Sequence, residues 1–355
     1  MSFMIVTPLN LASASENVKF KKIADVSAGD GYDILIDEGN DYCFVSLGYT
    51  GIKLYDITTM ESPELVEWKT QENNGYAHQL YKRGTNIYVG DGRAGLTVIN
   101  WSDPENFVIQ NRTLGYYGWS ATSDDAGETL FLASGGSLFG YDTEIVLFNI
   151  TNPGQLELIT EIPIPEYCVD VEHKDGVLYT TSEAVPLIAI DVSNTSNPIV
   201  LDQAPANTGD SFASDIEIVG NYAYIANWEG PFQVYDIQDP ANLTLVFENE
   251  DYSDSTCVKS DEEILFLTDG TEGLILLDIS DPINPIEFAR YNDGRVQYRV
   301  DIVDDYIFMT QQSYGFIILQ MSPKQIPGIS LEFIIITLIA TTGILLFLFR
   351  KKALK

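Results

Sequence analysis

Carboxylate side chains recur at one point of a repeated unit in this 355-residue chain. When the units are aligned, seven residues fall at one level: Asp33, His78, Ser120, Asp170, Asp215, Lys259 and Asp301. Carboxylates around one opening could supply oxygen ligands to a hard cation, and the four aspartates are weak candidates for such a metal site. A pair of them could also act as acid and base in glycoside hydrolysis. The alternative, which we favour, is a solvated set of acids whose charge is relieved by Lys259 and His78.

Aromatic residues gather just before that level and in the neighbouring loops. Those before it are Tyr32, Tyr76, Trp119, Tyr167, Phe212, Tyr252 and Tyr298. The loops add Tyr49, Tyr116, Tyr117, Trp228 and Tyr314, together with the acidic Glu229. Rings with polar groups around a concave opening suit a glycan or a peptide. The predicted ligand-binding residues are Tyr32, Asp33, Tyr76, His78, Trp119, Tyr167, Asp170, Phe212, Asp215, Trp228, Lys259, Tyr298 and Asp301. For any single ring, the alternative role is packing between repeated units.

Motifs of established catalytic chemistry are missing from the sequence. It contains no nucleophile elbow, HExxH zinc motif, phosphate-binding loop or dinucleotide fingerprint, so we expect no cofactor and a binding protein rather than an enzyme. The leading hypothesis is a surface receptor, adhesin or scaffold for a glycan, peptide or protein partner. A carboxylate-dependent, glycosidase-like hydrolase is the alternative, and a purely structural envelope protein is the third.

The elements that position these residues follow from an internal repeat. Seven copies of one segment lie 42 to 49 residues apart: FVSLGYTGIKLYDI (44–57), YVGDGRAGLTVINW (88–101), FLASGGSLFGYDTEIVLFNI (131–150), YTTSEAVPLIAIDV (179–192), YIANWEGPFQVYDI (224–237), FLTDGTEGLILLDI (266–279) and FMTQQSYGFIILQM (308–321). Each unit holds four short runs of alternating residues; in the first unit these are 32–38, 42–47, 51–57 and 64–69. Four strands per period are typical of a β-propeller blade. The sequence therefore predicts an all-β, seven-bladed propeller over 18–323.

The seventh unit supplies three strands (299–321) and then stops. The segment VKFKKIADV (18–26) precedes the first unit and has strand composition with no other partner. We expect it to complete blade seven, because pairing the two ends of the ring removes an exposed sheet edge.

These repeats resemble the LVIVD-repeat family of propellers. The resemblance is carried best by AHQLYKRGTNIYVGDGRAGLTVINWSDP (77–104), then by DIEIVGNYAYIANWEGPFQVYDIQDP (215–240) and the segment ending LILLDISDP (274–282). It spans roughly 18–323, and units three, four and seven depart most from the pattern. The resemblance implies a propeller fold and a surface location in bacteria or archaea, and it implies no established activity.

An Asp or Asn ends the third strand of six units, before a Ser/Thr- or Pro-containing turn: Asp56, Asn100, Asn149, Asp191, Asp236 and Asp278. The seventh unit has Gln320 there. An Asx side chain at this place caps a turn, so we expect a structural role.

Charge and cysteine content narrow the classes of partner. The net charge of −33 comes from 52 acidic and 19 basic residues, a surface that repels nucleic acid. We interpret this net negative charge as an adaptation for solubility or for high salt rather than for cation binding. Cys43, Cys168 and Cys257 allow one disulfide at most, and they are expected to be buried thiols.

The C-terminal segment is apolar and then basic. No charge occurs from Phe333 to Phe349, and 330–349 is long enough to span a bilayer as a helix. A short linker (324–329) precedes it, and the basic tail 350–355 is expected in the cytoplasm, with the propeller outside. The stretch also resembles PGF-type C-terminal sorting signals of archaeal surface proteins, with Pro327-Gly328-Ile329 where those signals have phenylalanine third.

The N-terminal residues 1–17 are interpreted as a signal-peptide remnant or a flexible N-terminus, since Ala12-Ser13-Ala14 is like a cleavage site. A tail-anchored protein with a cytoplasmic propeller is the rival topology. Five N-x-S/T sequons suit the exterior; they start at Asn100, Asn111, Asn149, Asn194 and Asn242.

Overall fold

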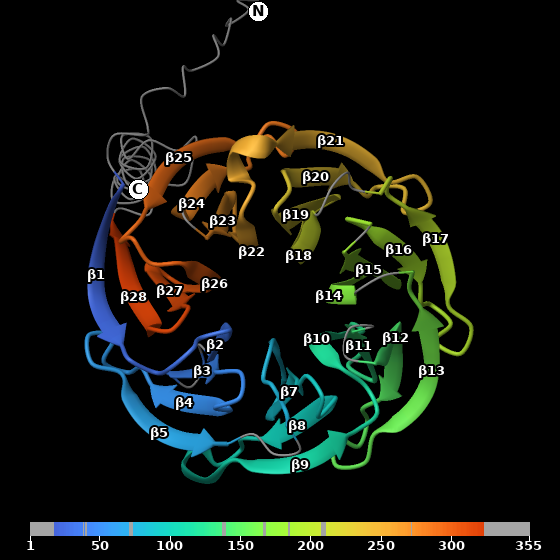
Figure 1. Ribbon diagram of the computed structural model, residues 1–355, viewed down its shortest axis with the longest axis horizontal. Coiled ribbons are helices and arrows are strands. Elements are labelled where there is room, and N and C mark those ends of the chain that lie inside the picture. The colour runs from blue at the N-terminus through green and yellow to red at the C-terminus, as the bar shows by residue number, and fades with distance from the viewer. Residues whose placement is uncertain are drawn as a thin grey trace, which may run out of the picture.

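In the computed structural model, the chain winds into a ring of seven four-stranded antiparallel sheets around a central channel (Figure 1). The structure describes residues 18–322 except 38, 40, 71–73, 137–139, 166–167, 184, 207–210 and 271. The predicted seven-bladed propeller is thereby confirmed. The predicted linker, membrane helix, basic tail and N-terminal segment lie outside the described residues. Within the described ranges, no helix is long and apolar enough to cross a membrane.

The first three blades follow one another along the chain. Blade one consists of β2 (Asp33–Asp37), β3 (Tyr42–Ser46), β4 (Ile52–Asp56) and β5 (Glu64–Lys69). Blade two consists of β6 (Leu80–Arg83), β7 (Asn86–Gly90), β8 (Leu96–Asn100) and β9 (Val108–Thr113), with the 3-10 helix η2 (Pro104–Asn106) before β9. Blade three consists of β10 (Gly118–Ser123), β11 (Thr129–Gly136), β12 (Tyr141–Asn149) and β13 (Glu157–Pro163).

The other four blades complete the ring. Blade four consists of β14 (Cys168–Lys174), β15 (Val177–Ser182), β16 (Ile188–Asp191) and β17 (Ile199–Gln203). Blade five consists of β18 (Phe212–Val219), β19 (Tyr222–Trp228), β20 (Phe232–Asp236) and β21 (Thr244–Asn249), followed by the 3-10 helix η4 (Glu250–Tyr252). Blade six consists of β22 (Ser255–Asp261), β23 (Ile264–Asp269), β24 (Gly273–Asp278) and β25 (Ile286–Tyr291). Blade seven consists of β26 (Gln297–Val303), β27 (Tyr306–Gln311), β28 (Gly315–Ser322) and β1 (Lys19–Val26).

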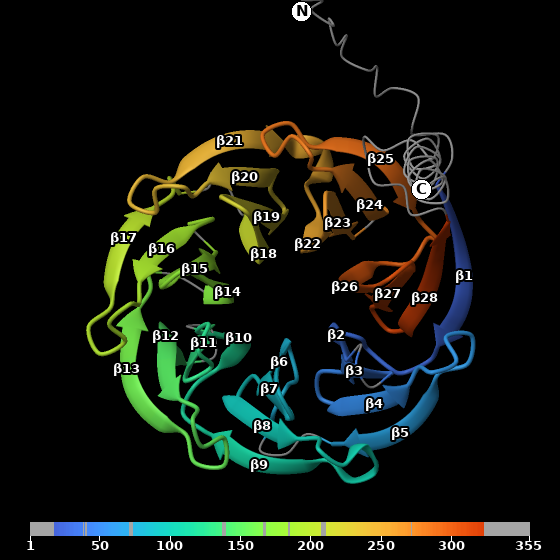
Figure 2. The same ribbon diagram turned by 180° about the vertical axis from the view of Figure 1, so that it is seen from behind.

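Strand β1 closes the ring as predicted. It pairs antiparallel with β28, from Lys19 opposite Ser322 to Val26 opposite Phe316. In both views it forms the outer strand beside β28 (Figures 1 and 2). Gly315, with φ +96°, lets β28 start close to β1: a Cβ there would lie 2.1 Å from the Val26 carbonyl oxygen. The glycine that opens the third strand of a unit therefore marks a close approach to the outer strand.

The hydrophobic core is divided into seven layers, each between two neighbouring blades. The layer between blades seven and one contains Ala24, Cys43, Tyr55, Phe308 and Phe316, all buried. Alternating apolar residues on both faces of each sheet supply these layers, since successive side chains of a strand point to opposite faces. Because the layers link all seven blades, the inner strands are held at fixed positions around the channel.

The strand-end acids act as turn caps, which confirms the structural role predicted for them. Asp56 Oδ1 accepts hydrogen bonds from the Thr58 amide (2.8 Å) and hydroxyl (2.6 Å). The same Oδ1-to-amide contact, two residues on, occurs at Asn100, Asn149, Asp191, Asp236 and Asp278. At the seventh position Gln320 instead donates to Asp305. The three cysteines are buried free thiols, as predicted.

Candidate functional site

Two cavities lie in the central channel, one above the other along the inner strands. The first, of about 320 Å³, opens on the face that carries the loops leading into the inner strands and the loops after the second strands. We call it the mouth cavity. The second, of about 380 Å³, is lined by residues further along the inner strands, and we call it the far cavity. Gln79 and Arg299 line both cavities and therefore separate them.

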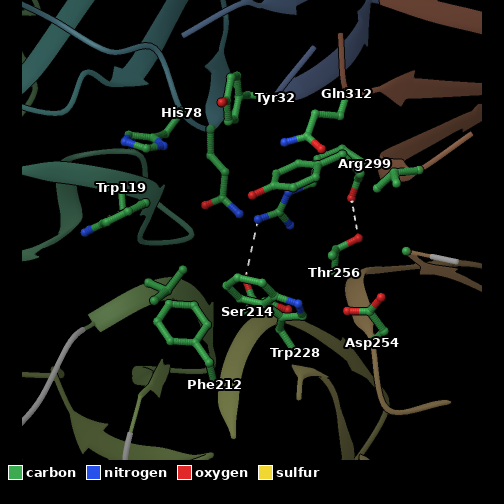
Figure 3. A pocket seen from close by; sticks show the side chains of 15 residues that line it. Tyr32, His78, Trp119, Phe212, Ser214, Trp228, Asp254, Thr256, Arg299 and Gln312 are labelled. Atoms are coloured by element: carbon green, nitrogen blue, oxygen red, sulfur yellow. Dashed lines mark hydrogen bonds between the residues drawn. The ribbon is translucent and has the colours of Figure 1, made fainter. Parts of the chain in front are cut away.

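The mouth cavity receives one residue from the inner strand of every blade, or from just before it. These residues are Tyr32, His78, Trp119, Val169, Ser214, Thr256 and Tyr298. Above them lie Phe212, Trp228, Asp254, Gly270, Val296 and Gln312. Figure 3 shows the side chains surrounding an open space, with the Arg299 guanidinium near its centre. The lining thus combines aromatic rings with about as many polar groups, a mixture found in small-ligand sites.

The aromatic wall is continuous across blades one to three. The ring centroids of Tyr32 and Tyr76 lie 4.9 Å apart, those of Tyr76 and His78 4.8 Å, and those of His78 and Trp119 4.1 Å. Tyr298 extends this wall from blade seven, 5.6 Å from Tyr32. Burial, reinforced by the charge of Arg299, lowers the pKa of His78 to about 3, so His78 is neutral at physiological pH.

The opposite wall comes from blades five and six. Trp228, at the end of β19, is 51% exposed, and its ring lies 6.5 Å from that of Phe212. Thr256 Oγ1 donates to the Tyr298 carbonyl oxygen at 2.9 Å, so the Thr256 hydroxyl proton is already used in a hydrogen bond (Figure 3). The Asp254 carboxylate accepts no hydrogen bond from any residue that the structure describes. This wall therefore offers an exposed ring beside an available carboxylate.

Five polar residues from five blades form the floor of the mouth cavity, and we call them the central polar network. Arg299 forms a buried ion pair with Asp215 and donates to the Ser214 carbonyl oxygen at 3.4 Å. With its amide oxygen toward Arg299, Gln79 accepts from the guanidinium and donates to Asp170 Oδ1 (3.0 Å) and Ser120 Oγ (3.2 Å). The network thus comprises Gln79, Ser120, Asp170, Asp215 and Arg299. It crosses the channel.

The four aspartates predicted as candidates for a cation site have a structural role, because each one bonds to the inner strand of the next blade. Asp33 Oδ2 accepts from the Leu80 amide at 2.7 Å, and Asp170 Oδ2 from the Ile216 amide at 3.1 Å. Asp215 Oδ2 accepts from Val258 and Asp301 Oδ2 from Ile36, both at 2.8 Å. In the described part of the chain, no three His, Cys, Asp or Glu residues are grouped so as to hold a metal ion.

Burial changes the ionisation of these acids. It raises the pKa of Asp33 to about 7, although the Arg299 charge and two amide hydrogen bonds oppose the shift. Burial and the neighbouring Asp215 charge raise the pKa of Asp170 well above its usual value. Arg299 forms its ion pair with Asp215, the other acid of the central polar network.

The predicted level of seven residues is wrong for three blades. The second residue of each repeated segment marks the same height in every blade. In blades one, two, six and seven, the inner-strand residue paired with it is Ile34 (opposite Val45), Leu80 (opposite Val89), Val258 (opposite Leu267) and Val300 (opposite Met309). Gln79, Cys257 and Arg299 therefore stand level with Asp33, in place of His78, Lys259 and Asp301. His78 lies one residue earlier, in the mouth cavity. Lys259 and Asp301 lie two residues further on, in the far cavity, where Lys259 Nζ is 3.7 Å from Glu217 Oε2.

The other predicted site residues divide into three groups. The mouth cavity brings together Tyr32, His78, Trp119, Phe212, Trp228 and Tyr298. Tyr76 packs behind Tyr32, and Tyr252 is buried in the core, where its hydroxyl donates to Glu287 at 3.0 Å. Tyr167 lies outside the described residues. Sequence reasoning missed Arg299, Gln79 and Asp254; an arginine that alternates with apolar residues in RVQYRVDI (295–302) was the available signal for Arg299.

Comparison with known proteins supports the fold and the repeat. A family model described as LVIVD repeat matches residues 74–112, 179–203, 210–251 and 258–293. No curated protein matches the sequence. Among solved structures, the computationally designed Ika8 protein is similar over 84% of this chain and 99% of its own, with TM-score 0.61 and 9% identity. A putative 6-phosphogluconolactonase from Bacteroides fragilis is similar over 79% and 89%, with TM-score 0.65 and 12% identity.

At such low identity, these two likenesses show the fold alone. The matched segments of the family model fall in blades two, four, five and six. The chain is therefore a seven-bladed β-propeller that contains LVIVD repeats.

Proposed function

We propose that this protein is a membrane-anchored binding module of the cell surface that holds a ligand in the mouth cavity. The observation that carries the proposal is the mouth cavity itself: about 320 Å³, walled by aromatic side chains from five blades. Rings of this kind supply large contact area with little loss of conformational entropy, and they dominate the binding energy of many interfaces. The net charge of −33 would repel nucleic acid, so a protein or small-molecule partner is proposed instead.

Orientation supports the same function. The second and fourth strands of a blade run toward the mouth, and the third strand, such as β28, runs away from it. The chain therefore leaves the propeller at Met321 on the opposite face. About eight residues separate Met321 from the apolar segment 330–349, a reach of at most about 28 Å. If that segment spans the membrane, the mouth cavity faces away from the bilayer and toward possible partners.

Binding is proposed in preference to hydrolysis because of how the channel carboxylates are used. A glycosidase needs two carboxyl groups that flank one bond and are free to exchange protons. Asp33, Asp170, Asp215 and Asp301 each accept a backbone hydrogen bond from the next blade. Asp254 is the one carboxylate that lines the mouth cavity among the described residues, and it has no acidic partner there.

The proposal is tested with the full-length chain, labelled and purified in mild detergent, on glycan and peptide arrays. A triple variant, Tyr32→Ala, Trp119→Ala and Trp228→Ala, should lose binding while its far-ultraviolet circular dichroism is retained. Because Tyr32 and Trp119 are partly buried, the single variant Trp228→Ala is tested as well. The matched control is Trp68→Ala, a ring of similar exposure (45%) on the outer strand β5. Loss of binding from changes in the turns at the opposite face, with the triple variant unaffected, would show that the ligand site is elsewhere.

A further inference from the structure

The mouth cavity has a closed floor. Gln79 and Arg299 separate it from the far cavity, and the ion pair between Arg299 and Asp215 holds this boundary in place. An occupant therefore enters from the open face and ends at the floor. A volume of about 320 Å³ is at the lower end of the range for ligand sites, so the cavity admits one long side chain or a small molecule but no strand or helix.

The lining of the mouth cavity carries one carboxylate whose charge the described chain does not offset. Among the described residues that line it, Arg299 and Asp254 are the charged ones, since His78 is neutral. Arg299 already has its counter-charge in Asp215 at the floor. The Asp254 side chain forms no ion pair and accepts no hydrogen bond within the described ranges. The mouth cavity therefore attracts a cation, and shielding from bulk water strengthens that attraction.

Backbone contacts from two blades hold Asp254 at the cavity wall. Asp254 pairs with Trp228 of blade five in an isolated antiparallel bridge, and its carbonyl oxygen accepts from the Gly270 amide of blade six at 2.9 Å. A Cβ at position 270 would lie 2.6 Å from Asp254 Oδ2, so glycine there leaves room for the carboxylate. Residues directly opposite each other in an antiparallel pair carry their side chains on the same face. The Asp254 carboxylate is thus held beside the Trp228 indole (Figure 3).

The aromatic walls favour the same sign of charge. Trp228 and Phe212 stand on the Asp254 side of the cavity, and Trp119 stands on the other (Figure 3). The face of an aromatic ring attracts a cation, most strongly for tryptophan. Trp228 is 51% exposed, and within the described chain no lysine or arginine lies over its ring. An exposed ring and an unpaired carboxylate therefore stand together at the same wall.

The combination of ring and carboxylate distinguishes between kinds of organic cation. A quaternary ammonium group packs on rings but donates no hydrogen bond, so it leaves the carboxylate oxygens of Asp254 without donors. The ammonium group of a lysine donates hydrogen bonds, but it is strongly hydrated and has no flat face. A guanidinium group meets both requirements, because its N–H edge matches a carboxylate in two parallel hydrogen bonds and its weakly hydrated faces stack on aromatic rings.

From the closed floor, the unpaired Asp254 carboxylate and the neighbouring rings, we propose that the mouth cavity binds a guanidinium group, carried by an arginine side chain of a peptide or protein. This inference rests on the proposed function and names the ligand class of the same site. The guanidinium group lies against the Trp228 ring and donates to both carboxylate oxygens of Asp254.

Calorimetry on the full-length chain in detergent tests this specificity. The probes are N-acetyl-arginine amide, its uncharged isostere N-acetyl-citrulline amide, N-acetyl-lysine amide and tetramethylammonium. The arginine probe should bind, and each of the other three should bind at least about tenfold more weakly.

Two variants separate direct contact from general attraction. Asp254→Asn should weaken the arginine probe at least about tenfold, because charge-assisted hydrogen bonds are lost. The matched control is Glu250→Gln, which removes an exposed negative charge from the same loop, outside the cavity lining. It should change the affinity by less than about twofold, since exposed charges are screened by salt.

The outcomes separate this inference from the proposed function. Binding of the citrulline, lysine or tetramethylammonium probe as tightly as the arginine probe would overturn the guanidinium assignment and leave a binding module. An arginine affinity unchanged in Asp254→Asn would do the same. So would absence of arginine binding while the arrays still show a ligand that is lost in Trp228→Ala. If the arrays show no ligand and the arginine probe does not bind, both proposals fail.

Discussion

Arg299 of blade seven forms an ion pair with Asp215 of blade five across the central channel. Both side chains are about nine-tenths buried, and each makes a further contact with backbone: Asp215 with the Val258 amide, Arg299 with the Ser214 carbonyl. The pair therefore connects three blades, five, six and seven, at the floor of the mouth cavity.

Removal of one partner alone should strongly destabilise the propeller. Arg299→Met leaves Asp215 buried without its counter-charge, and the free energy of unfolding should fall by about 3–5 kcal/mol. The double variant Arg299→Met/Asp215→Leu should recover much of this loss, because no unpaired buried charge remains. Urea denaturation followed by tryptophan fluorescence measures the effect. A double variant whose loss equals the sum of the two single losses would contradict the coupling.

Asp33 should make stability depend on pH. Burial raises its pKa from 3.8 to about 7 in the folded protein, so between these pH values the folded state binds more protons than the unfolded state. Its contribution to the free energy of unfolding is thus fully present below about pH 4 and declines as pH rises through 7. Asp33→Asn removes this proton linkage. The stability of the parent relative to the variant should therefore decrease from pH 4 to pH 7, as measured by denaturation at several pH values. A constant difference would refute the assignment.

Deletion of residues 1–27 should greatly weaken the fold. It removes β1, exposes the edge of β28, and strips Ala24 and Val26 from the core layer between blades seven and one. We expect a melting temperature well below that of the parent and a less cooperative transition in scanning calorimetry. A shorter deletion, of residues 1–17, is the control and should leave melting unchanged. Equal melting of the parent and the longer deletion would show that the ring does not depend on β1.

The location of the propeller is testable in cells. The apolar segment 330–349 should keep the protein in the membrane fraction, and protease added to intact cells should remove the propeller. A cytosolic protein serves as the control for cell integrity. Protection of the propeller until lysis would favour the tail-anchored topology with a cytoplasmic propeller.

Sequence reasoning succeeded for the ring because the repeated residues have local physical roles. Glycine at Gly51 or Gly315 is required by a positive φ and a close carbonyl, and Asp56 or Asp278 caps a turn two residues on. Because the same turn and the same close approach occur in several blades, the same residue types return at the same positions of the repeat. The closure by 18–26 followed from counting strands, since an unpaired edge is costly.

It was harder to predict which residues of the seven inner strands lie at the same height in the channel. Five of the seven inner strands contain an irregularity in their pairing; in β26 it falls between Gln297 and Val300, next to Arg299. An extra residue at such a point shifts every side chain after it to the other face, and the sequence has no constant residue there to mark it. The predicted alignment placed Lys259 and Asp301 at the level of Asp33, although they lie two residues further along their strands, and it overlooked Arg299.

The pairing of β28 with both β27 and β1 determines how the propeller would carry a mechanical load. A pull on the chain beyond Ser322 acts along β28, which is hydrogen-bonded on both sides. A ligand held in the mouth cavity would pull from the opposite face, so tension would run parallel to the strand and perpendicular to its hydrogen bonds. Those bonds would then be sheared together rather than broken one after another. A tether at this point would resist detachment forces, such as those of fluid flow, better than a tether on a terminal edge strand.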